Sequence, residues 1–210
     1  MKNSDGKNKG KTTRKTKDLI ITDNKYYFYR SLFWIFIGTI SFIFDNVIVK
    51  VANAVQYPLL FEFFYSITLL GEVYIFIWIV LIIIATLLIY RKPITTAILT
   101  TAFAGIVSWS LKSIVGRPRP FEIENITGRV STTFSSFPSG HTLLFFSIVP
   151  IISKSFPKLK IWIWTIAVLI GLSRIYLGVH YFSDVVCGAI IGYTIGWAFL
   201  KIGEKHAWKY

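Results

Sequence analysis

Residues 75–90 read IFIWIVLIIIATLLIY, a run without a charged side chain, and Arg91, Lys92 and Pro93 follow it directly. Together with the apolar residues before it, the run covers 66–90. A helix needs about 20 residues to cross the hydrocarbon core of a bilayer. Basic residues at the end of such a run are typical of a membrane–water boundary. The stretch therefore predicts a membrane-spanning helix.

Five further apolar segments of comparable length lie before and after this run, at 31–49, 94–111, 139–156, 161–178 and 184–201. The composition agrees, since 54% of the residues are hydrophobic and 16% are charged, whereas about 25% are charged in an average soluble domain. We predict an all-α integral membrane bundle of six transmembrane helices that occupies residues 31–201.

The distribution of basic residues predicts the orientation of this bundle. With the N-terminus in the cytoplasm, 17 of the 23 Lys and Arg residues fall on the cytoplasmic side. Cytoplasmic loops carry such an excess, so we expect both termini to be cytoplasmic. Residues 1–30 hold few large apolar side chains, so we predict that they form a disordered basic tail. We predict that residues 202–210 form a short cytoplasmic tail. The net charge of +13 is largely a property of the N-terminal tail, so no nucleic-acid partner is expected.

Small residues recur on the last predicted helix. Gly188, Gly192 and Gly196 follow one another at intervals of four residues and therefore share one helix face. Such stripes let two helix backbones approach closely. We interpret this one as packing within the chain, and a homodimer contact is the alternative that the sequence leaves open.

Three polar clusters interrupt the second half of the chain: KSIVGRPRP at 112–120, PSGH at 138–141 and SRIYLGVHYFSD at 173–184. In the predicted topology all three lie at the outer, non-cytoplasmic ends of helices. Ionisable residues near membrane segments are costly, which makes such clusters candidates for a functional site.

The residue types in these clusters are suited to phosphate chemistry. His180 and Asp184 are four residues apart and meet on one face if the last helix begins near His180. A carboxylate on one imidazole nitrogen makes the other a nucleophile or a general base. Ser139 and Gly140 begin a helix whose N-terminus can bind phosphate, with His141 placed as a general acid. Each feature alone also fits an ordinary surface pair or helix start.

Cations that can bind phosphate oxygens or anchor lipid headgroups complete the clusters: Lys112, Arg117, Arg119 and Arg174. Two acidic residues, Asp45 and Glu72, lie near the outer ends of the first two predicted helices. Each has two interpretations, a contact with a substrate headgroup or a hydrogen bond between helices or to water. Arg117 is likewise a candidate substrate contact.

The three clusters resemble the signature KX6RP, PSGH and SRX5HX3D of the type 2 phosphatidic acid phosphatase superfamily. Lys112 and Arg119-Pro120 match the first element, in which the six-residue spacing selects Arg119 over Arg117. Residues 138–141 match the second. The positions that match the third are Ser173, Arg174, His180 and Asp184.

The resemblance implies roles for these residues. His180 would attack phosphorus to form a phosphohistidine, oriented by Asp184, while His141 would protonate the leaving oxygen and then activate water. The phosphate oxygens would be held by Lys112, Arg119, Ser139, the Gly140 amide and Arg174. The resemblance implies neither a metal nor another cofactor, and the sequence contains neither HExxH nor a Walker A motif.

The expected protein is thus a metal-independent lipid phosphatase in a prokaryotic plasma membrane, with its site facing outside and membrane lipids around it. Undecaprenyl diphosphate is the favoured substrate, and phosphatidylglycerophosphate, phosphatidic acid and lipid A phosphates are alternatives. A lipid phosphotransferase with the same intermediate is a second hypothesis. A non-catalytic transporter or lipid-binding protein is a third. The sequence leaves the oligomeric state open.

Overall fold

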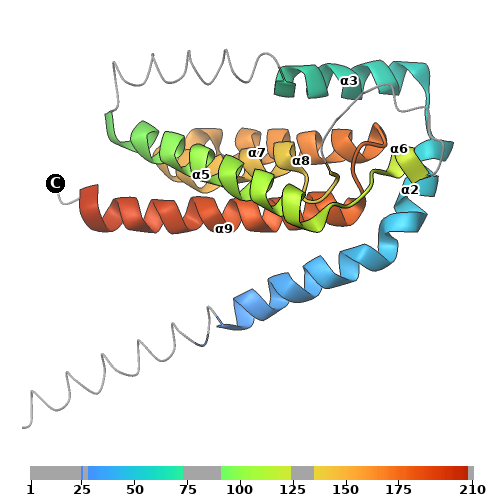
Figure 1. The fold of residues 1–210 in the computed structure, drawn as a ribbon. Helices are drawn as coiled ribbons and strands as arrows, with labels where there is room; N and C mark the ends of the chain where they lie inside the picture. The colour runs from blue at the N-terminus through green and yellow to red at the C-terminus, as the bar shows by residue number, and fades with distance from the viewer. Residues whose placement is uncertain (1–24, 26–27, 73–90, 124–134, 208–210) are drawn as a thin grey trace, which may run out of the picture. The chain divides into compact units, whose positions relative to one another are not determined.

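The computed structural model describes residues 25, 28–72, 91–123 and 135–207, which Figure 1 shows in colour. The chain divides into two units, Met1–Thr39 and Ile40–Tyr210. In the first unit, residues 28–39 are helical. The first helix therefore already includes the last three residues, 28–30, of the predicted tail, and most of the tail lies outside the described residues.

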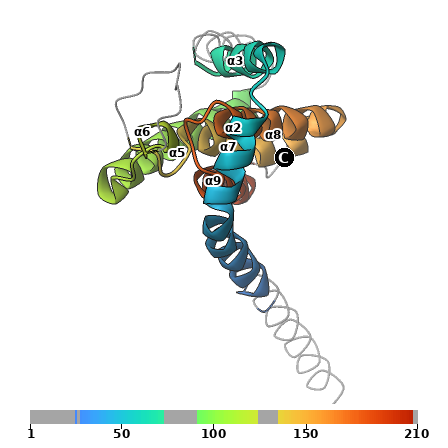
Figure 2. The same ribbon diagram turned by 90° about the vertical axis from the view of Figure 1, so that its right-hand side faces the viewer.

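In its described residues the second unit contains helices joined by short loops and no strands, which confirms the all-α prediction. Its elements are η1 (Phe42–Phe44), α2 (Asp45–Ala54), α3 (Pro58–Glu72), α5 (Arg91–Val115), α6 (Pro120–Ile123), α7 (Gly140–Ser155), η2 (Pro157–Leu159), α8 (Lys160–Tyr176) and α9 (Phe182–Ala207). Figures 1 and 2 show α5, α7, α8 and α9 running side by side, and α3 packs on α8.

The contact between α7 and α9 forms the centre of this unit, and the glycine stripe makes it possible. A Cβ atom at Gly192 would lie 2.1 Å from the carbonyl oxygen of Leu143, and one at Gly196 would lie 2.0 Å from that of Ser147. At Gly188 the distance to the Ser139 oxygen would be 2.9 Å. The stripe thus serves packing within the chain, as the sequence predicts.

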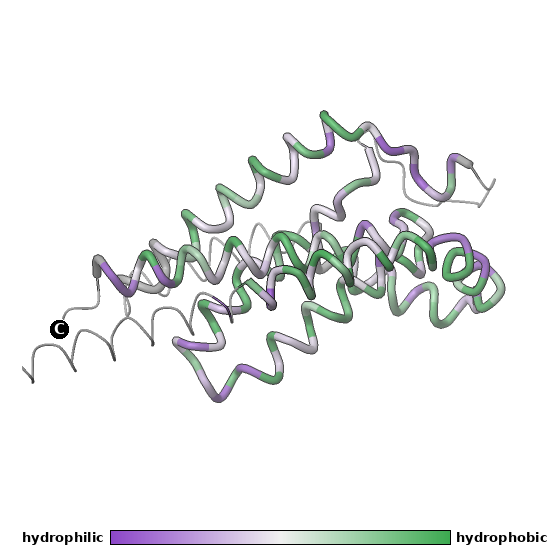
Figure 3. The backbone as a smooth tube through the Cα atoms, turned by 90° about the horizontal axis from the view of Figure 1, so that it is seen from below, coloured by the Kyte–Doolittle hydropathy of each residue, from purple (hydrophilic) through white to green (hydrophobic). Residues whose placement is uncertain are grey.

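Many large apolar side chains face outward, whereas several small polar ones are buried. Ile106 and Trp109 on α5 are 63% and 62% exposed, and Ile161 on α8 is 70% exposed. In contrast, Thr142 and Ser147 of α7 are fully buried. Figure 3 shows apolar residues along most of the helices. Extended exposed apolar surface is typical of a protein surrounded by lipid, so this arrangement fits an integral membrane protein.

Four helices in the described part of the chain are long and apolar enough to cross a membrane: Phe28–Ala54, Thr96–Glu122, Pro157–Tyr176 and Phe182–Lys205. They correspond to the first, third, fifth and sixth predicted spans. The fourth, 139–156, coincides with α7, a helix of 16 residues.

The second predicted span, 66–90, is described only up to Glu72. Its helix begins at Pro58, earlier than predicted, because proline is well suited to the first position of a helix and apolar residues follow it. Residues 73–90 lie outside the described residues. The total of six spans and the cytoplasmic termini therefore remain predictions.

Candidate active site

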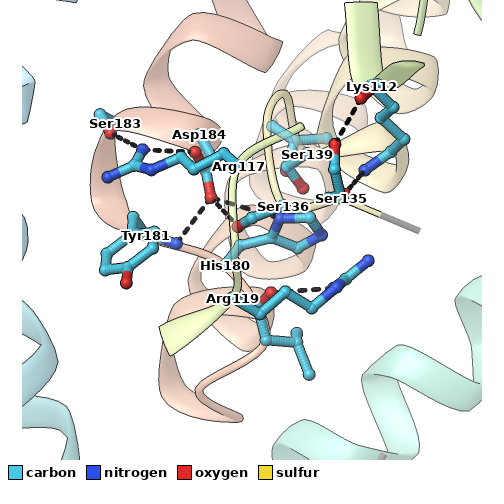
Figure 4. A network of polar contacts seen from close by, with 12 residues as sticks. Lys112, Arg117, Arg119, Ser135, Ser136, Ser139, His180, Tyr181, Ser183 and Asp184 are labelled. Carbon is cyan, nitrogen blue, oxygen red and sulfur yellow. Dashed lines mark hydrogen bonds and ion pairs between the residues drawn. The ribbon is translucent and has the colours of Figure 1, made fainter. Parts of the chain in front are cut away.

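The three motifs, far apart in the sequence, meet at one end of the bundle, as Figure 4 shows for many of their residues. Lys112 lies in the last turn of α5, and Arg117 and Arg119 lie in the connection to α6. Ser139 precedes α7, which carries His141 in its first turn. Arg174 lies in the last turn of α8, His180 lies in the loop after this helix, and Asp184 lies in the first turn of α9.

His180 and Asp184 form a buried pair. Nδ1 of His180 lies 3.6 Å from Oδ2 of Asp184, and the two residues are 2% and 0% exposed. The last helix, α9, begins at Phe182, two residues after His180 and close enough to it for the expected pair to form. The reason for this start is capping: Asp184, the third residue of α9, accepts a hydrogen bond of 2.9 Å from the Tyr181 amide. The helix thus starts after the histidine, and the pair still forms.

The environment of His180 favours a neutral imidazole. Burial is the main cause that lowers its pKa, to about 3; Asp184 opposes the shift, and the charges of Arg174 and Arg119 add to it. A neutral imidazole has a lone pair on one nitrogen. With Nδ1 toward the carboxylate, that lone pair is on Nε2, which is the form that a nucleophile requires.

The residue before α7, Ser139, is hydrogen-bonded to the main chain of Asp184. The Ser139 amide donates a hydrogen bond of 3.0 Å to the main-chain carbonyl of Asp184. The Ser139 hydroxyl lies 2.9 Å from the Thr142 hydroxyl and does not cap the helix. The backbone N–H groups at a helix N-terminus form an anion-binding site, here beside the buried His180–Asp184 pair.

Lys112 lies against this helix start. Its Nζ donates a hydrogen bond of 2.7 Å to the carbonyl of Ser135, and the Ser135 hydroxyl donates one of 2.7 Å to the carbonyl of Lys112. A Cβ atom at Gly140 would lie 3.2 Å from Ser108 Oγ and 3.7 Å from Lys112 Cε. The glycine therefore lets Ser108 approach the first turn of α7 closely, and Lys112 lies at an ordinary contact distance.

Arg119 and Arg174 support the turn that carries His180. Nη1 of Arg119 donates a hydrogen bond of 2.9 Å to the carbonyl of Val179. The carbonyl of Arg174 accepts one of 3.2 Å from the His180 amide. Both arginines are buried, with exposures of 4% and 2%. Their charges and that of Lys112 also act electrostatically on His141.

The candidate substrate contacts have a different environment. Arg117 forms ion pairs of 2.7 Å with both Asp45 and Asp184. Asp45 is 4% exposed and also accepts hydrogen bonds from Ser183. These contacts favour the second interpretation of Asp45, a bond between helices. The side chain of Glu72 lies outside the described residues.

Two serines that the sequence does not single out also contact the site. The hydroxyl of Ser136 donates a hydrogen bond to Oδ2 of Asp184, and Ser183 binds both Arg117 and Asp45. Ser136 precedes PSGH by two residues, and Ser183 precedes Asp184. Serine is common next to helix starts, so neither position carries a recognisable signal. In the described residues no three His, Cys, Asp or Glu side chains gather as metal ligands.

The model of the PAP2 superfamily matches residues 93–208, a segment that holds all three motifs and more than half of the chain. This chain belongs to the PAP2 superfamily. The phosphatidylglycerophosphatase B of Bacillus subtilis is 31% identical to this PAP2 protein over 77% of the chain and 84% of its own length. An undecaprenyl-diphosphatase of Sulfolobus acidocaldarius is 32% identical over 56% of this chain and 60% of its own length.

A solved structure agrees with this assignment. The crystal structure of a transmembrane PAP2-type phosphatidylglycerolphosphate phosphatase from Bacillus subtilis has a TM-score of 0.70 to this PAP2 protein. The two chains are 28% identical, and the match covers 85% of this chain and 96% of the other. The membrane fold and the family resemblance predicted from the three motifs are therefore supported by both sequence and structure.

Proposed function

We propose that this PAP2 protein is an integral membrane phosphatase that removes a phosphate group from a lipid phosphate or lipid diphosphate through a phosphohistidine. The observation that carries the proposal is the buried pair of His180 and Asp184 beside the N-terminus of α7. A neutral imidazole, a carboxylate and a helix terminus surrounded by cations provide a nucleophile, its orienting group and a phosphate site in one place.

In the first step, Nε2 of His180 attacks phosphorus while the P–O bond to the lipid breaks. Asp184 holds the Nδ1 proton and stabilises the positive charge that develops on the ring. His141 donates a proton to the leaving oxygen. Lys112, Arg119 and Arg174, with the Ser139 hydroxyl and the Gly140 amide, balance the negative charge on the phosphate oxygens, and such electrostatic stabilisation is usually the largest contribution to catalysis.

In the second step, water attacks the phosphohistidine, and the N–P bond breaks. His141, now unprotonated, accepts a proton from this water, so that inorganic phosphate and the original enzyme are formed. Neither step uses a metal ion or an oxidant. The two histidines thus have distinct tasks, nucleophile for His180 and acid followed by base for His141.

We propose undecaprenyl diphosphate as the substrate, with phosphatidylglycerophosphate, phosphatidic acid and lipid A phosphates as alternatives. Relatives that act on a diphosphate and on a monophosphate lipid both resemble this chain, so the substrate requires direct comparison. We place the site on the outer face of a prokaryotic plasma membrane. The support is the distribution of Lys and Arg, of which 17 of 23 fall on the cytoplasmic side in this orientation.

The test is release of inorganic phosphate by the purified protein from a panel of these lipids. We expect release with wild-type protein and none with His180→Ala. Phosphate release at the wild-type rate by His180→Ala would contradict the nucleophile assignment. A phosphotransferase would transfer phosphate to an added acceptor in place of water, and a transporter or lipid-binding protein would bind the lipids and release no phosphate.

A further inference from the structure

Arg117 bridges two buried carboxylates that are far apart in the sequence, Asp45 and Asp184. Its Nη2 lies 2.7 Å from Oδ2 of Asp45, and its Nη1 lies 2.7 Å from Oδ1 of Asp184. Nη1 also donates a hydrogen bond of 2.7 Å to the Ser183 hydroxyl. Figure 4 shows the guanidinium beside Ser183 and Asp184. The bridge thus ties the start of α2 and the start of α9 to the first motif.

Two aromatic rings contact the planar face of the Arg117 guanidinium, whose edge binds the carboxylates. Its Cζ lies 3.9 Å from the centre of the Tyr181 ring and 5.3 Å from that of Phe42. Guanidinium groups stack favourably on aromatic rings, and their planar donors suit carboxylates. The orientation of Arg117 is therefore fixed by groups of the protein. This arrangement favours a structural or positioning task over a contact with substrate.

Asp45 holds the start of the helix that carries Asp184. Its Oδ1 accepts a hydrogen bond of 2.8 Å from the Ser183 amide, and its Oδ2 accepts one of 2.6 Å from the Ser183 hydroxyl. Ser183 is the second residue of α9. A carboxylate at this end of a helix satisfies an amide and interacts favourably with the helix dipole. Asp45 thereby fixes α9, while Arg117 fixes the carboxylate that faces His180.

We propose that Arg117, supported by Asp45, is a positioning residue that keeps Asp184 ionised and aimed at Nδ1 of His180. The inference rests on the proposed function of His180 as nucleophile. A fully buried carboxylate is costly unless a cation compensates it. Without Arg117, two buried carboxylates would lack their shared cation. Asp184 would then turn away or bind a proton, and the imidazole would lose its fixed orientation.

The experiment compares Arg117→Gln, Arg117→Lys and the double variant Asp45→Asn/Arg117→Gln with wild type. Lys154→Gln is the matched control, because it breaks an ion pair with Glu204 at the other end of α7 and α9. Each protein is measured for kcat and KM of phosphate release from lipid, for Tm, and by NMR with ¹⁵N-labelled histidine. The sequence has three histidines, so the signal of His180 can be assigned with His180→Asn.

We expect kcat of Arg117→Gln to fall about 10- to 100-fold, as when other groups that orient a functional imidazole are lost, with KM nearly unchanged. The ¹⁵N signals of His180 should change as well. The double variant should regain Tm, since it removes one uncompensated carboxylate, but neither kcat nor the His180 signal. Arg117→Lys, which keeps one cation, should be intermediate. Lys154→Gln should match wild type in kcat and in the His180 signal.

Three results would overturn the inference. A rise in KM with unchanged kcat would make Arg117 a substrate contact. Recovery of kcat together with Tm in the double variant would make its task purely structural. Wild-type kcat and wild-type His180 signals in Arg117→Lys would show that the planar guanidinium of Arg117 is not needed. This variant tests the inference if Arg117→Gln does not fold. If wild-type protein releases no phosphate but the His180 signal still changes in Arg117→Gln, the proposed function fails, whereas the orientation of His180 by Arg117 and Asp184 stands.

Discussion

The amide of Ser139 donates a hydrogen bond of 3.0 Å to the main-chain carbonyl of Asp184. This bond joins the start of α7, where phosphate is expected to bind, to the residue that orients His180. The glycine stripe of α9 continues the same contact along both helices. Helix packing therefore sets the relative position of the proposed nucleophile and the proposed phosphate site, so we expect changes at the close α7–α9 contact to affect activity.

Replacing Gly192 by alanine should disturb this contact. The added Cβ would lie 2.1 Å from the carbonyl oxygen of Leu143, and forcing extra atoms into a packed core costs about 1 to 3 kcal/mol. We expect a lower Tm and lower phosphate release for Gly192→Ala. The matched control is Gly105→Ala on α5, where a Cβ meets nothing within 4 Å. If both variants kept the wild-type Tm, the close contact of α7 and α9 would be refuted.

His141→Ala should separate the two chemical steps. Loss of a general acid or base costs about 10²- to 10⁴-fold in rate. A substrate with a good leaving group, such as a nitrophenyl phosphate, does not need the acid in the first step. We therefore expect phosphorylated protein to accumulate in His141→Ala, detected by transfer of radiolabel to the protein from a substrate that carries the label in its phosphoryl group. No phosphorylated protein should form in His180→Ala. Labelling of both variants would place the phosphate on another residue.

The pKa of His180 predicts its behaviour in a pH titration. Because burial lowers that pKa to about 3, the imidazole stays neutral as the pH falls from 8 to 5. The nucleophilic form is present above the lowered pKa and is lost only as the pH falls through it. The NMR signals of His180 in the unliganded protein should thus be constant over this range. A midpoint near 6.5, the ordinary value for histidine, would contradict a buried neutral nucleophile.

Cysteine labelling should test the orientation. In intact cells, Thr127→Cys in the connection before PSGH should react with a membrane-impermeant thiol reagent. Lys158→Cys, in the connection between α7 and α8, should react only after the membrane is permeabilised. The native Cys187 is only partly exposed, and a Cys187→Ser background removes its signal. The reverse labelling pattern would invert the proposed topology.

Chelation should leave activity intact. The proposed steps use two histidines and fixed cations to do what a metal ion does in other phosphatases, so we expect undiminished phosphate release in excess EDTA. Protein that is treated with EDTA, dialysed and assayed with and without added Mg²⁺ provides the comparison. Complete loss of phosphate release that Mg²⁺ restores would rule out the metal-free mechanism.

Much of the fold and of the candidate site follows from local features of the sequence. Long apolar runs predict helices because a bilayer demands about 20 apolar residues, and the described parts of these runs are helical. The resemblance of the motif spacings to the family signature singles out His180, Asp184 and Arg119 as expected site residues. The glycine stripe likewise predicts close helix packing from its four-residue period.

Only the tertiary structure separates Arg117 from Arg119. The two arginines are two residues apart, yet Arg117 lies between Asp45 and Asp184, whereas Arg119 binds the turn before His180. Asp45 and Ser183 are 138 residues apart in the sequence, so no local pattern predicts their contact. The start of α9 at Phe182 also depends on the tertiary structure, because one of the groups that cap this helix is Asp45 from α2. Local hydropathy and the motif pattern thus single out the helical segments and the candidate site residues, whereas packing between helices that are distant in the sequence determines what each charged group contacts.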